Sequence, residues 1–147
     1  MSILTQNTLN NKICFDGIGI HTGKKAKLVI NPAAPNSGIV FKRSDLKKNN
    51  LVYPNYLNVT DTTLCTTISN EYGVKVSTIE HLMGAFYGTG VDNALVEINT
   101  EELPILDGSA KIFVDEIKKV GIKSSDKPIK IIKINKEVKL NNQEKFI

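Results

Sequence analysis

The sequence of 147 residues contains no tryptophan and only two cysteines and two histidines. Cys14 and Cys65 stand far apart and form no Cys-x-x-Cys motif, which favours a reducing compartment over a disulfide framework. No stretch approaches the roughly 20 apolar residues that a membrane-spanning helix needs. Residues 1–11 are polar and lack the apolar core of a signal peptide. These absences predict a cytoplasmic protein without stable membrane insertion.

Arginine is also scarce, because Arg43 is the only arginine among 19 basic residues. The 15 acidic residues leave a net charge of +4, and aromatic residues make up only 6% of the chain. Proteins that recognise phosphate or guanine usually rely on the bidentate geometry of arginine. The composition therefore predicts that nucleic acid is not a partner.

What is present is typical of an ordinary globular domain. Hydrophobic residues make up 41% of the chain and charged residues 23%. A domain of this size buries roughly 70% of its unfolded surface, so it needs no disulfide or metal merely to fold. The length allows one domain and a fragment of a second.

Alternating apolar residues predict strands along the first part of the chain. The predicted strands cover residues 13–15, 26–30, 38–43, 64–68 and 94–98. Two helices follow from apolar residues at spacings of three and four. The first begins near Ser77, where Ser77 and Glu80 fit a capping box, and ends at Gly88 to Gly90. The second runs from about Ser109 to Gly121.

The last part of the chain predicts a domain boundary. Residues 123–128 are polar and are the best candidate for a linker, whereas residues 129–140 alternate like a strand with one bulge. We therefore expect an α+β domain over 1–126, built as a two-layer sheet with two helices, and the first strands of an incomplete second domain over 127–147.

A glycine-rich segment at 17–24 invites comparison with phosphate-binding loops, and its spacing does not match them. Gly17 and Gly23 enclose five residues where the Walker A motif needs four, and Thr22 occupies the third glycine of the dinucleotide motif. Two interpretations remain open. The segment is a tight turn between strands, or it is a loop whose backbone approaches a substrate and presents His21.

The adjacent Glu80 and His81 also allow two interpretations. A capping carboxylate and a solvated histidine explain both residues without any chemistry. At 100° per residue, however, His81 lies about 200° round the helix from Ile79 and so points away from the apolar face. A glutamate beside a histidine suits hydrolysis at a metal, where imidazole binds zinc and the carboxylate takes a proton from water.

The remaining polar motifs have simple structural explanations. Asp92-Asn93 and residues 107–109 are interpreted as turn and cap residues. Residues 62–67 are interpreted as a strand, since Cys65 has no adjacent base that would activate it.

Five segments, in this order and spacing, resemble UDP-3-O-acyl-N-acetylglucosamine deacetylases. They are residues 17–24, 63–66, 76–83, 90–93 and 104–110. The resemblance implies two similar α+β domains, each a sheet with two helices, with the active site between them. It also implies a zinc-dependent hydrolase that removes acetate from a small-molecule substrate, an acylated UDP-amino sugar, in the committed step of lipid A synthesis.

The same resemblance implies roles for individual residues. His81 would be a zinc ligand and Glu80 the general base. The segment Thr63, Leu64 and Cys65 and the loop of Ile20 and His21 would line the substrate site.

The histidine count limits what this chain can do. In the family, the other zinc ligands and a further histidine come from the second domain, yet no histidine follows His81 in this sequence. We therefore expect an N-terminal portion of the enzyme, missing its second domain and inactive alone. The alternative is a non-catalytic module of the same fold that binds a sugar nucleotide or a protein partner.

Overall fold

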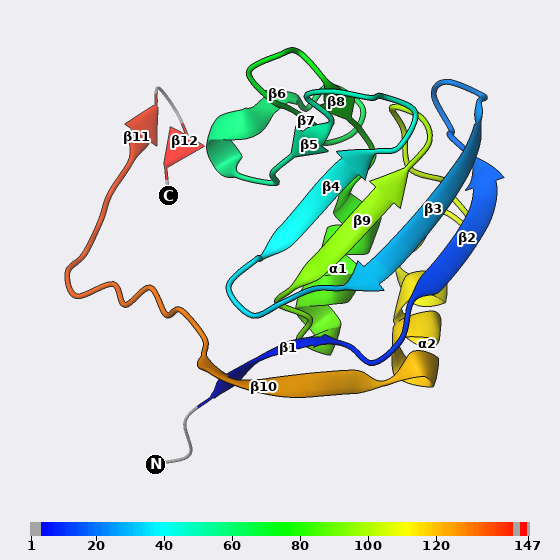
Figure 1. Ribbon diagram of the computed structural model, residues 1–147. Helices are drawn as coiled ribbons and strands as arrows, with labels where there is room; N and C mark the ends of the chain where they lie inside the picture. The colour runs from blue at the N-terminus through cyan, green and yellow to red at the C-terminus, as the bar shows by residue number, and fades with distance from the viewer. Residues whose placement is uncertain (1–3, 143–144, 147) are drawn as a thin grey trace.

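The computed structural model describes residues 4–142, 145 and 146, and its centre is a five-stranded sheet (Figure 1). The strands lie in the order β2-β3-β9-β4-β5. Their bounds are β2 Ile13–Ile18, β3 Lys25–Pro32, β9 Ala94–Ile98, β4 Ile39–Arg43 and β5 Leu51–Val52. β9 pairs parallel with β4, and the other neighbours are antiparallel. The predicted strand at 94–98 is confirmed with the same bounds.

Two helices, α1 (Glu80–Thr89) and α2 (Lys111–Val120), lie side by side on one face of this sheet (Figure 1). The core fills the space between the two layers, and there the ring of Phe15 in β2 meets that of Phe113 in α2 edge-on at 5.0 Å. Leu82 and Phe86 of α1 are buried beside them. The predicted α+β class, with a sheet and two helices, is confirmed.

The bounds of α1 differ from the prediction at its start. Thr78 has a φ of 58°, which is not a helical conformation, so the helix begins at Glu80 rather than Ser77. The predicted capping box is wrong, because the Ser77 hydroxyl donates to the carbonyl of Glu101 instead. At the other end Gly90 caps the helix in the left-handed conformation, with a φ of 75°. The predicted stop at Gly121 for α2 is confirmed.

A second, three-stranded sheet lies near the start of α1. It consists of β6 (Val59–Asp61), β7 (Thr67–Ser69) and β8 (Lys75–Val76), and the short 3₁₀ helix η1 (Tyr56–Asn58) precedes it. The predicted strand at 64–68 is therefore wrong over residues 64–66, since residues 62–66 form a loop. Threonine favours strands, but here the side chain of Asp61 bends the chain by accepting hydrogen bonds from Thr63.

The predicted linker at 123–128 is wrong. These residues belong to β10 (Ile122–Pro128), which pairs antiparallel with β1 (Thr5–Leu9) in a separate two-stranded ribbon. β10 is polar because nearly all of its side chains face solvent, so it shows no apolar alternation that sequence analysis could detect. The N-terminal segment and residues 122–128 are thus held together in one structural unit.

The predicted strand at 129–140 is also wrong. The structure describes no strand over these residues, and the apolar side chains of Ile131 to Leu140 are 64–93% exposed. A short hairpin of β11 (Asn141–Asn142) and β12 (Lys145–Phe146) follows. Alternating isoleucines favour a strand only where a neighbouring strand pairs with them. The division of the chain into domains at 126 and 127 stays a prediction.

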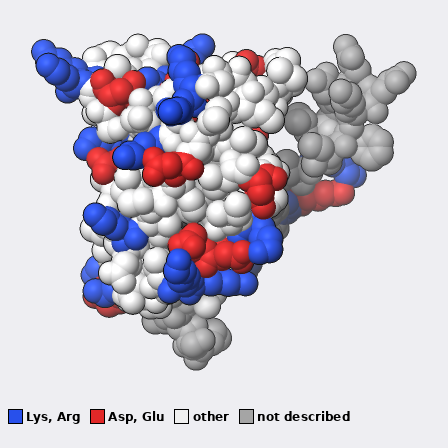
Figure 2. Space-filling view, turned by 90° about the vertical axis from the view of Figure 1, so that its right-hand side faces the viewer, with Lys and Arg blue, Asp and Glu red and all other residues white. Residues whose placement is uncertain are grey.

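The charged surface mixes both signs. On the face shown in Figure 2, lysine and arginine side chains lie among aspartates and glutamates rather than in one basic area. Ion pairs such as Lys42–Glu97 and Lys24–Glu101, each at 2.8 Å, bring opposite charges together. Over the described residues, the helices are too short and too polar to cross a membrane.

Candidate functional site

Glu80 and His81 occupy the first turn of α1, on a surface that also includes the loop 62–66. The Oε2 atom of Glu80 accepts a hydrogen bond from the backbone N–H of Thr66 at 3.0 Å. Both Glu80 and His81 are half-buried. A carboxylate at a helix N-terminus also interacts favourably with the helix dipole. The structure therefore fixes the orientation of Glu80 against this loop.

The loop 62–66 contains Thr63, Leu64 and Cys65, the three neighbouring residues that the family resemblance implies would line the substrate site. Thr63 donates to Asp61 Oδ1 twice, from its backbone N–H at 2.9 Å and from its hydroxyl at 2.8 Å. These hydrogen bonds lower the pKa of the Asp61 carboxyl. Leu64 is 79% exposed, whereas Cys65 is half-buried with its Sγ 3.8 Å from the Thr67 hydroxyl. Asp61 shapes this loop, a role that the sequence did not reveal.

A shallow cavity of about 350 Å³ opens beside Glu80. Its lining is largely apolar and includes Tyr56, Val59, Ile79 and Met83. The carboxylate of Glu80 thus lies beside an apolar surface. Small-molecule sites commonly combine an apolar lining with a few polar groups in this way.

The glycine-rich segment is a tight turn between β2 and β3, as one of the two interpretations predicted. Gly19 and Lys24 pair across it, and the N–H of Gly23 donates to the carbonyl of Gly19, both at 3.0 Å. Ile20 and His21 lie at the tip of this turn with exposed side chains.

Glu102 holds the turn from beneath, and its carboxylate is fully buried. It accepts hydrogen bonds from the backbone N–H groups of His21 and Thr22, at 3.0 and 2.8 Å, and from the Thr22 hydroxyl at 2.7 Å. Burial raises its pKa, but the bonds from Thr22, His21 and Thr78 outweigh that effect and leave the pKa below its ordinary value. Sequence analysis missed Glu102, because it follows another glutamate in a turn-rich segment that is typical of solvent-exposed carboxylates.

The predicted site residues are therefore brought to one end of the molecule in two groups. Glu80 meets the loop 62–66 through Thr66, and the turn of His21 meets the start of α1 through Glu102, which also accepts from the Thr78 hydroxyl at 3.2 Å.

The described residues do not supply a complete metal site. In the part of the chain covered by the structure, no three His, Cys, Asp or Glu side chains lie close enough to hold one ion. Catalytic zinc takes three protein ligands and a water. His81 is half-buried in the first turn of α1 and carries an imidazole, a side chain that commonly binds zinc.

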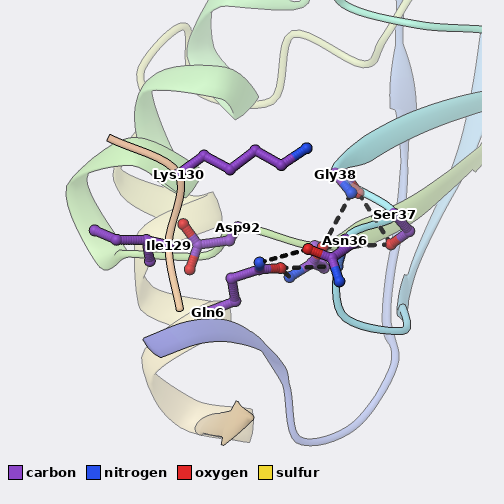
Figure 3. Close-up of a pocket in the computed structure, with 8 residues that line it drawn as sticks. Gln6, Asn36, Ser37, Gly38, Asp92, Ile129 and Lys130 are labelled. Carbon is purple, nitrogen blue, oxygen red and sulfur yellow. Dashed lines mark hydrogen bonds between the residues drawn. The ribbon is translucent and has the colours of Figure 1, made fainter. Parts of the chain in front are cut away.

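A different polar region lies at the opposite end of α1, where Gln6, Asn36, Asp92 and other residues line a cavity of about 440 Å³ (Figure 3). Asn93 is buried there, donating to Gln6 Oε1 and accepting from the N–H of Gly38. The interpretation of Asp92-Asn93 as turn and cap residues is thus wrong, because both make hydrogen bonds to distant segments, Asp92 to the backbone N–H of Asn7. The ten-residue helix, about 15 Å long, separates this cavity from Glu80.

Curated relatives match nearly all of this chain. A protein named UDP-3-O-acyl-N-acetylglucosamine deacetylase from Chromohalobacter salexigens is 48% identical over 92% of this chain and 45% of its own length. Proteins of the same name from Teredinibacter turnerae and Vibrio cholerae are 46% and 38% identical over 97% and 98% of the chain, each across 47% of the relative. The chain thus spans about half the length of these relatives.

The family model described as LpxC, UDP-3-O-acyl N-acetylglycosamine deacetylase, matches residues 6–147. The match includes all five segments that carry the sequence resemblance, from the glycine-rich turn to residues 104–110. This chain belongs to the UDP-3-O-acyl N-acetylglycosamine deacetylase family.

Proposed function

We propose that this chain contributes the Glu80–His81 part of the active site of a zinc-dependent hydrolase. The reaction would remove acetate from the 2-amino group of a UDP-3-O-acyl-N-acetylglucosamine in lipid A biosynthesis. The names of the curated relatives support the substrate and the deacetylation. The observation that carries the proposal is the fixed carboxylate of Glu80, bonded to Thr66 N–H beside an open cavity and next to an imidazole in the sequence.

Glu80 would act as the general base. Its Oε2 atom is held by the Thr66 N–H, so the carboxylate has one orientation in which Oε1 can accept a proton from an attacking water. His81 would supply one nitrogen ligand to zinc. When bound, zinc would favour ionisation of water and polarise the amide carbonyl.

The exposed residues around Glu80 would form the substrate wall. Ile20 and Leu64 are 59% and 79% exposed, so both large apolar side chains are accessible for contact with an acyl chain. His21, Thr63 and Cys65 would lie near the sugar.

We also propose that the 147 residues do not complete the site on their own. Catalytic zinc needs three protein ligands, and of the two histidines in the chain the proposal assigns only His81 to zinc. The remaining ligands would come from a second domain in the longer protein. The protein would act in the cytoplasm, in keeping with its cysteine usage.

The test is acetate release from UDP-3-O-acyl-N-acetylglucosamine with added zinc. The chain would be assayed alone and after fusion to the remaining part of the Chromohalobacter salexigens relative. We expect no turnover from the chain alone, and turnover from the fusion that stops with a chelator and returns with zinc.

Two results would contradict this proposal. Turnover by the chain alone, near that of the intact relative, would show that the 147 residues already complete a site. A folded fusion that binds the sugar nucleotide but releases no acetate would favour the non-catalytic module instead.

A further inference from the structure

Glu102 is a fully buried carboxylate that the proposed reaction does not use. Its four hydrogen bonds come from two different segments. Three come from His21 and Thr22 in the turn, and the fourth comes from Thr78, two residues before Glu80. A buried carboxylate with several donors is usually ionised, which agrees with its lowered pKa.

Gly17 and Gly19 leave the space that the turn needs to pack against the segment of Glu102. A Cβ atom at Gly19 would lie 2.3 Å from Glu102 Oε2, and one at Gly17 would lie 2.7 Å from the Cβ of Pro104. Both glycines therefore allow the turn to approach residues 102–104 of the same chain. The backbone N–H groups of His21 and Thr22 point to Glu102, so the turn offers a ligand its side chains rather than these donors.

The other side of Glu102 is tied to the start of α1. Ser77 exchanges backbone hydrogen bonds with this segment, donating to Glu101 at 2.8 Å and accepting from Leu103 at 3.1 Å. Thr78 then adopts a φ of 58°, an unfavourable region for a β-branched residue that persists only where the surroundings enforce it. Its hydroxyl bond to Glu102 is one such restraint.

We propose that Glu102 is a positioning residue that fixes the His21 turn relative to the first turn of α1, which carries Glu80 and His81. This inference rests on the proposed function, because it assigns the two positioned segments to one active site. Glu102 itself touches no substrate. It acts by setting where the Ile20 and His21 side chains stand with respect to Glu80.

Backbone amide NMR of the full chain tests the coupling. In Glu102→Gln, the side-chain NH₂ or the lost charge weakens the bonds on both sides, so the amide resonances of His21, Thr22 and residues 78–81 should all shift. In the wild type, the His21 and Thr22 amide resonances should titrate together at a pH below the ordinary pKa of a glutamate, because the hydrogen bonds to Glu102 lower its pKa. The matched control is Glu101→Gln, whose partly exposed side chain reaches the same turn through Lys24. The control should leave the resonances of residues 78–81 in place.

A milder variant keeps the test decisive if Glu102→Gln does not fold. Thr22→Val removes one hydroxyl donor from an exposed residue, and Thr22→Ser restores it. We expect Thr22→Val to shift the resonances of residues 78–81 and Thr22→Ser to return them to the wild-type positions. Changes confined to residues 19–24 would overturn the proposal.

The test separates this inference from the proposed function. The spectra are recorded without zinc or substrate, so loss of the coupling refutes the role of Glu102 whatever the fusion protein does. An inactive fusion with intact coupling refutes the deacetylase assignment instead.

Discussion

The two ends of α1 both bury polar groups, but they do so in different ways. At one end Glu102 gathers N–H and O–H donors around a negative charge, in what we call the Glu102 cluster, formed by His21, Thr22, Thr78 and Glu102. At the other end, the Asn93 cluster joins uncharged groups: Gln6, Asn36, Gly38 and Asn93.

The difference separates a network that joins distant strands from one that orders a turn beside the candidate site. In the Asn93 cluster, amide groups donate and accept in turn, and Gln6 also donates to the carbonyl of Pro128 in β10, so the cluster ties the β1–β10 ribbon to the sheet. The Glu102 cluster stands beneath a turn whose side chains remain exposed, beside the helix end that carries Glu80. The buried charge orders the backbone and leaves the side chains above it available.

The largest expected effect contrasts the two acidic residues at either end of α1. In the active fusion, Glu80→Gln should lower the rate of acetate release by about 10²–10⁴-fold, the range typical of a lost general base. Asp92→Asn should change the rate by less than about twofold, because Asp92 lies at the far end of the helix. Steady-state kinetics of both variants decide this. Equal losses of rate in the two variants would contradict the assignment of the active site to the Glu80 end of α1.

Asn93→Ala should have the largest effect on stability. It leaves the half-buried N–H of Gly38 without its acceptor and removes one of the two donors to Gln6 Oε1, which keeps the N–H of Asn36, so it should cost about 1–3 kcal/mol of unfolding free energy. Urea unfolding measures this, with Asn99→Ala as the control. Asn99 also accepts a backbone hydrogen bond, from Lys27 at 2.7 Å, but is exposed, so its loss should cost less than about 1 kcal/mol. Similar costs would contradict the role given to burial.

Acid should destabilise the Glu102 cluster more than the Asn93 cluster. The folded-state pKa of Glu102 lies below the unfolded value of about 4.3. Its contribution to stability is therefore complete above that value and is lost as the pH falls through the folded pKa, at up to about 1.4 kcal/mol per pH unit. Unfolding free energies between pH 5 and 3 should fall less steeply in Glu102→Gln than in the wild type. Asn93→Ala should keep the wild-type slope.

The smallest expected effect concerns Glu101, the exposed neighbour of Glu102. Its ion pair with Lys24 lies on the surface, so Glu101→Gln should cost less than about 1 kcal/mol. Thermal unfolding at low and high salt checks this, because salt screens such a pair and should remove the difference between variant and wild type. A larger cost that persists in salt would show that both glutamates brace the turn.

Sequence periodicity predicted the elements that face the core and missed those that do not. The strand at 94–98 and the helix ending at Gly121 were predicted because their buried faces impose a regular apolar pattern. The sequence predicts a linker where β10 forms, because the side chains of β10 face solvent. It predicts a strand over residues 129–140, where the structure describes none and only the N–H of Ile129 extends the pairing with the N-terminal segment, by a bond to Leu4. An apolar pattern reports burial and carries no direct information on backbone pairing.

The candidate site divides in the same way. The sequence by itself determined the family and the adjacent Glu80 and His81. Both depend only on which residue types follow one another in the chain, and this order can be read without knowing any contact. Only the tertiary structure decided that Thr66 orients Glu80 and that Glu102 lies buried between the His21 turn and Thr78. The physical reason is that a carboxylate is exposed or buried according to the donors that surround it, and here those donors come from segments far from Glu102 in the sequence.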